Sequence, residues 1–171
     1  VDKIENIKLS DHAIEIFNVA LLTNSYFPKK NISNEQFLKI KSDWLIKLKD
    51  LNLIKTYLAK NKNLASDSIL VRFYVDHYLS MANIGKACEI FEKINFEIND
   101  DYISKFKVYC FINSNKNEEA QLHLDLLTEG GFEDVFFENK FAKLMGYDES
   151  INKEISEKSL LDFHLSHRTS Q

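Results

Sequence analysis

A chain of 171 residues with 44% hydrophobic residues is long enough for one domain with a real core, or for one short array of repeated units. Its net charge of −4, with both signs mixed along the chain, leaves no basic stripe for nucleic acid. No apolar run reaches the length of a membrane span, and four glycines and one proline are too few for sheets joined by tight turns. The composition predicts an all-α protein, without nucleic acid as a partner and without a membrane-spanning segment. Because the chain starts at Val1, we expect it to be part of a longer or processed protein.

Residues 1–33 are expected to form a lead-in and one capping helix. Ser10 is a favourable N-cap for a helix that runs to about Ser25. Ser33, with Gln36 three residues later, has the spacing of a capping box and predicts the start of the next helix.

Residues 34–130 show a period of 33 residues. Ala87 has Ile54 one period before it and Ala120 one period after it. The same step relates three sets of large apolar residues: Phe37, Leu70 and Ile103; Ile40, Phe73 and Phe106; Leu45, Tyr78 and Phe111. Within each unit the apolar spacing is that of two helices joined by a short polar turn. We therefore predict three helix–turn–helix repeats that share one continuous core.

Residues 131–171 are expected to cap this array. Gly130 and Gly131 end the last repeat, and an apolar helix follows to about Gly146. A last short helix is expected from about Ser156 to Ser166. The period fades here, as it does at the end of an array.

The repeats resemble tetratricopeptide repeats. The resemblance is carried by a small residue followed four places later by a large one, with an aromatic residue upstream: Ala87, Phe91 and Tyr78, then Ala120, Leu124 and Phe111. Two departures are the period, which is 34 in that family, and the loss of its late small residue, replaced by Asn61, Ile94 and Leu127. The resemblance implies a right-handed solenoid with a peptide-binding inner face. The alternative is a set of helical hairpins without repeat kinship.

A row of polar residues on the first helices is the candidate partner groove. Its members are one period apart, with a second set four residues later: Lys39, Arg72 and Lys105, then Asp43, Asp76 and Tyr109. In a solenoid the row would line a groove that grips an acidic or C-terminal peptide, although the tetratricopeptide carboxylate clamp has Asn where Asp43 and Asp76 stand. The alternative is that Lys39–Asp43 and Arg72–Asp76 are plain ion pairs along one helix, each worth about 0.3–0.5 kcal/mol.

Two cysteines remain open to two interpretations. Helices folded back about Asn99 place Cys88 opposite Cys110, where the two could form a disulfide or could be two small buried side chains. A disulfide would indicate an oxidising compartment such as a bacterial periplasm. Parts of the stretch from Cys88 to Gly130 are similar to exported proteins of alphaproteobacteria: Tyr109-Cys110, Glu119-Ala120-Gln121-Leu122 and Leu126-Leu127-Thr128-Glu129-Gly130. The resemblance favours the periplasm over the alternative, the cytoplasm.

Catalytic, cofactor and metal motifs are missing from the sequence. His164 and His167 lie three residues apart near Asp162, but no third ligand follows, so we expect surface or interface histidines. His77 and His123 fall among helical core positions. We therefore expect no enzyme and no cofactor, but a protein–protein interaction scaffold within a larger bacterial protein. The alternatives are a helical accessory domain of a cell-envelope enzyme whose catalytic part lies elsewhere, and a self-assembling array.

Overall fold

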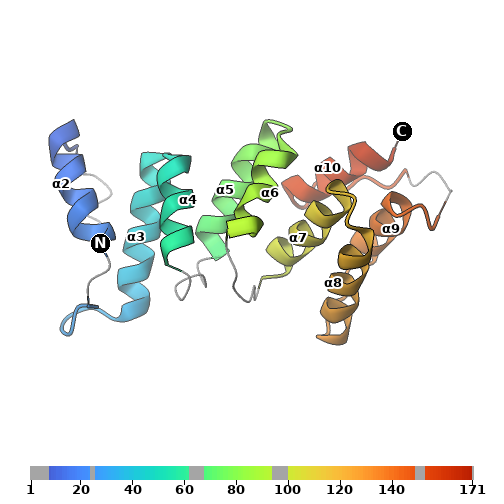
Figure 1. Ribbon diagram of the computed structural model, residues 1–171, viewed down its shortest axis with the longest axis horizontal. Coiled ribbons are helices and arrows are strands. Elements are labelled where there is room, and N and C mark those ends of the chain that lie inside the picture. Colours follow the sequence, from blue (N-terminus) through green and yellow to red (C-terminus); the bar gives the residue numbers. More distant parts are fainter. Residues whose placement is uncertain (1–7, 24–25, 62–67, 94–99, 149–152, 171) are drawn as a thin grey trace.

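The computed structural model describes residues 8–23, 26–61, 68–93, 100–148 and 153–170. Within these ranges every regular element is an α-helix, and there are nine of them (Figure 1). In chain order they are α2 (Asp11–Leu22), α3 (Asn34–Leu48), α4 (Leu51–Lys60), α5 (Ser68–Ser80), α6 (Ile84–Lys93), α7 (Asp101–Asn113), α8 (Asn117–Glu129), α9 (Val135–Leu144) and α10 (Leu160–Thr169). The prediction of an all-α protein is confirmed for the part of the chain that the structure describes.

Helices α3 to α8 pack as consecutive pairs: α3 on α4, α5 on α6, and α7 on α8. Figure 1 shows these pairs following one another along the long axis of the molecule, with α2 at one end, α9 at the other, and α10 reaching back from the α9 end toward α5. Each pair is joined by a turn of a few residues. In the first of these turns Lys49 adopts a left-handed conformation, and the Asp50 carboxylate then caps α4.

Local signals set most helix starts. The Ser33 hydroxyl accepts the Gln36 amide at 3.1 Å and the Gln36 side chain accepts the Ser33 amide at 2.9 Å, which is the predicted capping box. Ser10 caps α2, as expected, but that helix ends at Leu22 because Thr23 is already extended. The predicted end at Ser25 lies outside the described residues.

Some of the periodic positions lie in the middle of the core. Ile54, Ala87 and Ala120 are fully buried on the second helices, and so are Leu70 and Ile103 on the first helices. A small residue at two of these positions lets the helices approach closely. Five other periodic positions on the first helices are only half-buried: Phe37, Ile40, Phe73, Tyr78 and Phe111. Burial therefore follows the 33-residue step at some positions and not at others.

The last helix differs from its prediction. α10 runs from Leu160 to Thr169 rather than from about Ser156 to Ser166. It starts late because the Ser159 side chain accepts the Asp162 amide at 3.0 Å and so caps the helix there. The Ser156 amide instead donates to the Ser166 hydroxyl at 3.0 Å. α10 then turns back and packs against α5 and α9.

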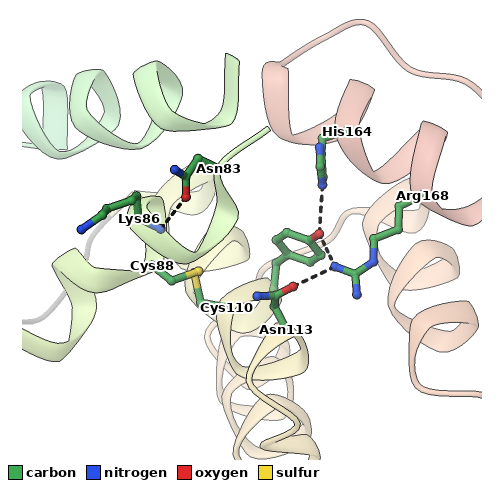
Figure 2. Close-up of a disulfide and its surroundings, with 8 residues drawn as sticks. Asn83, Lys86, Cys88, Cys110, Asn113, His164 and Arg168 are labelled. Carbon is green, nitrogen blue, oxygen red and sulfur yellow. Dashed lines mark hydrogen bonds between the residues drawn. A yellow bond between two sulfur atoms is a disulfide. The ribbon is translucent and has the colours of Figure 1, made fainter. Parts of the chain in front are cut away.

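A disulfide joins Cys88 on α6 to Cys110 on α7, with the two Cα atoms 5.6 Å apart (Figure 2). Of the two interpretations that the sequence left open, the structure has the bridged one. The turn expected near Asn99 lies outside the described residues. Among the described helices, none combines the length and the apolar character needed to cross a membrane.

Candidate partner-binding face

The predicted row lies on the helices that the sequence assigned to it. Lys39 and Asp43 are on α3, Arg72 and Asp76 on α5, and Lys105 and Tyr109 on α7. Their surroundings nevertheless change along the row from exposed to fully buried, because α10 covers its last third. We call α3, α5 and α7 the first helices, and the side that carries these residues the first-helix face.

The first pair lies at the surface. Lys39 Nζ is 2.9 Å from Asp43 Oδ2, and the lysine side chain is 66% exposed. An exposed pair one helical turn apart contributes only a few tenths of a kcal/mol, so here the plain ion-pair interpretation describes the energetics.

The second pair belongs to a larger cluster. Arg72 Nε lies 3.6 Å from Asp76 Oδ2, and its guanidinium stacks 4.3 Å from the centre of the Tyr102 ring. The Tyr102 hydroxyl donates to Asp76 and also meets the backbone of Leu161, at the start of α10. Burial raises the pKa of Asp76 above its ordinary value, although Tyr102 and Arg72 oppose the shift. This pair of the row therefore reaches α10 through one tyrosine.

Lys105 is buried between two carboxylates. Its Nζ lies 2.7 Å from Asp134 Oδ2 and 3.5 Å from Asp162 Oδ1, and its side chain is 10% exposed. Asp134 also caps α9, where its Oδ1 accepts the Phe137 amide at 3.0 Å. Burial alone would raise the pKa of Asp134, but the Lys105 ammonium and the Phe137 amide outweigh it and lower the pKa. Lys105 thus ties α7 to both α9 and α10.

Tyr109 is fully buried under α10. Its hydroxyl lies 3.0 Å from His164 Nε2 and accepts a hydrogen bond from the Arg168 guanidinium, which also donates to Asn113 Oδ1 at 3.1 Å (Figure 2). Burial lowers the pKa of His164, with smaller contributions from the positive charges of Arg168 and His167. A neutral imidazole is the form that fits beside the arginine.

The inward side of α10 completes the contact. Leu161 and Leu165 are fully buried in the core, and Asp162, Ser166 and Thr169 are nearly so. The hydroxyls of Ser166 and Thr169 donate to carbonyls one turn earlier in their own helix, so they need no partner on the face below. Small side chains with satisfied hydroxyls allow α10 to lie close to the helices beneath it.

His77 and His123 pack against aromatic rings, whereas His167 is exposed. His77 meets the Tyr78 ring edge-on, and His123 stacks on Phe111 with the ring centres 4.9 Å apart. Burial, with the nearby Lys107, lowers the pKa of His123. In the described ranges no three His, Cys, Asp or Glu side chains gather closely enough to hold a metal ion.

A hollow lies between α2 and α4. Its volume is about 440 Å³, and its walls are formed by Asn18, Val19, Leu22, Thr23, Leu53, Lys60 and Asn61. The Asn61 amide donates to the Tyr57 carbonyl at 2.8 Å, and the Asn18 carbonyl accepts the Trp44 indole at 2.7 Å. Both side chains already hydrogen-bond within the protein, so they offer the hollow few polar groups for recognising a specific ligand.

The 33-residue period indicates the row but not the side chains that contact it. Asp134, Asp162, His164 and Arg168 are the partners of Lys105 and Tyr109, and they lie up to 59 residues away along the chain. Leu161 and Leu165, four residues apart, mark the inward face of α10 but not its target, whereas Leu160 and Phe163, which hydrophobicity would also place inward, are exposed.

Comparison with family models, with curated proteins and with solved structures gives no match for this chain. No family is therefore shown. What the structure shows is an all-helical domain with hairpin-like packing and a face on which one of its own helices is bound.

Proposed function

We propose that this domain is a non-catalytic scaffold that binds another protein through its first-helix face, as part of a larger bacterial protein. One observation carries the proposal: the far end of that face already holds a helix, α10, by apolar burial, an ion pair and hydrogen bonds. Charged side chains continue along the same face onto α5 and α3. A surface with this chemistry suits a protein segment better than a small molecule.

The proposal includes the repeat architecture. We infer that the helix pairs are three repeats of a right-handed, tetratricopeptide-like solenoid with terminal caps, with the first helices on its inner side. The 33-residue period and the consecutive pairing of α3 to α8 support this arrangement. Such a solenoid would present the row to a partner as one extended surface.

The disulfide supports an extracytoplasmic location. Bridged cysteines persist in oxidising compartments and are rare in the cytoplasm, so Cys88 and Cys110 favour the periplasm over the cytoplasm. The same bridge favours one alternative function, an accessory helical domain of a cell-envelope enzyme. Reading the gene on both sides of this chain separates the two, because that alternative needs a catalytic domain in the same polypeptide.

Site-specific photocrosslinking in the host cell tests the scaffold. A photoreactive residue replaces Lys39 or Arg72 on the first-helix face, and Glu92, exposed on α6, serves as the matched control position. We expect a defined protein adduct at the first two positions and none at the third. An adduct with the mass of a second copy would support the self-assembling array. Absence of any face-specific adduct would refute the scaffold.

A further inference from the structure

We propose that α10 is a built-in competitor: it occupies the site on the first-helix face where a helix of a partner protein binds, and the partner displaces it. We call this site the seat; Lys105, Tyr109 and Asn113 form its polar part. This proposal rests on the scaffold function above and names the partner by chemistry. The partner is an amphipathic helix with the α10 spacing Leu-Asp-x-x-Leu-x-x-Arg, as in Leu161, Asp162, Leu165 and Arg168.

Each position of that spacing has a partner on the face. The two leucines enter the core and are fully buried. The acidic position meets Lys105 at 3.5 Å, and the basic position donates to Tyr109 and to Asn113. These contacts spread over the ten residues of α10, so a helix with only the apolar pair would lose both charged ends. The face therefore selects both register and direction.

The seating of α10 leaves one polar group unsatisfied. Asp162 Oδ1 is buried and accepts no hydrogen bond from the described residues, although it lies 3.5 Å from the Lys105 ammonium. A buried acceptor without a donor weakens binding. The other carboxylate oxygen, Oδ2, accepts only a long bond of 3.3 Å from the Ser156 hydroxyl. A partner helix that places its carboxylate against Lys105 with a full hydrogen bond would bind better than α10 does.

α10 is also suited to leave. A ten-residue helix is marginal by itself in water, so its order depends on its packing against α5 and α9 and on its side-chain contacts with α7. Its other side faces solvent, where Leu160 is 42% and Phe163 54% exposed. Displacement would thus release a short segment and would uncover Lys105, Tyr109 and the cavity left by the two leucines.

A peptide-binding experiment tests the competition. The probe is a fluorescent peptide of residues 153–170, titrated into the whole chain. In the variant Leu161→Ala/Leu165→Ala the internal helix is weakened but the seat is intact. In the unmodified chain α10 occupies the seat most of the time, and the apparent affinity for the peptide is lowered in proportion to the fraction of molecules whose seat is free. We therefore expect the peptide to bind this variant roughly tenfold or more tightly than the unmodified chain.

Matched controls lie on the same helix. Leu160→Ala/Phe163→Ala truncates the outward residues, and its affinity for the peptide should equal that of the unmodified chain. Adding Asn113→Ala to the weakened variant removes one acceptor of the arginine position and should reduce the gain without disturbing the buried ion cluster. A milder variant, Arg168→Ala, should give an intermediate increase and covers the case in which the double variant does not fold.

Hydrogen exchange decides between a competitor and a structural helix. We expect the weakened variant to lose amide protection in residues 160–169 while α5, α7 and α9 keep theirs. Loss of protection throughout those helices would make α10 an integral part of the core and would overturn the proposal. So would equal peptide affinity in a folded variant, or a dimer of the unmodified chain that the peptide dissociates, because the occupant would then be a second copy. In each of these cases adducts with another protein at Lys39 and Arg72 would leave the scaffold function standing.

Discussion

Removing the disulfide gives the sharpest prediction for stability. The bridge between Cys88 and Cys110 closes a loop with a sequence separation of 22 residues. In the chain-entropy account, closing a loop of that size removes freedom from the unfolded chain that is worth about 3 kcal/mol at 25 °C. The variant Cys88→Ala/Cys110→Ala should therefore unfold with a free energy lower by about that amount.

Urea denaturation followed by circular dichroism measures this loss. With a typical urea slope, a loss of about 3 kcal/mol lowers the midpoint by roughly 1–3 M. Reductant should lower the midpoint of the unmodified chain by a similar amount and should leave the double variant unchanged, which is the internal control. Equal midpoints for the oxidised chain and the variant would refute the reasoning, because the loop would then constrain nothing in the unfolded state.

Three further predictions concern single side chains. Lys105→Met should lower the free energy of unfolding by about 3–5 kcal/mol in urea denaturation, because it leaves two carboxylates without their cation. Asp162→Asn removes only one carboxylate and should cost less. The reverse order would contradict the proposed ion cluster. Burial lowers the pKa of His164 from its ordinary 6.5, so the unfolded chain binds the proton more readily than the folded one. The stability that this histidine contributes should therefore be full above pH 6.5 and should fall below it. His164→Gln should make the urea midpoint less dependent on pH between about pH 5 and pH 8, and an unchanged pH dependence would refute the assignment. Gly85→Ala, in a helix with open space around the new Cβ, should raise the free energy of unfolding by about 0.5–1 kcal/mol. The same change at Gly131, which has a φ of +93°, should lower it by about 1 kcal/mol, and equal signs for the two would contradict the conformational argument.

The helices of this protein were readable from sequence because their signals are local. The capping box at Ser33 and Gln36 needs only residues three apart, and the structure has both of its hydrogen bonds. The inward positions Ile54, Ala87 and Ala120 follow from helical spacing and recur at a fixed step, and all three are fully buried. Hydrogen bonds within a helix, and the burial of one side of it, depend on residues that are close together in the sequence. They can therefore be predicted from the sequence.

The candidate site was readable only in part. Lys39 and Lys105 occupy the same position of the period and look alike in sequence, yet one side chain is 66% exposed and the other 10%. The difference comes from α9 and α10, whose residues Asp134 and Asp162 lie against Lys105 on α7 and not against Lys39 on α3. Local spacing in the sequence was enough to place the helices, their apolar stripes and the two possible states of the cysteines. Which polar residues are buried, and what pairs with them, depends on segments that are tens of residues apart in the chain and meet only in the folded protein. No local pattern in the sequence predicts those contacts.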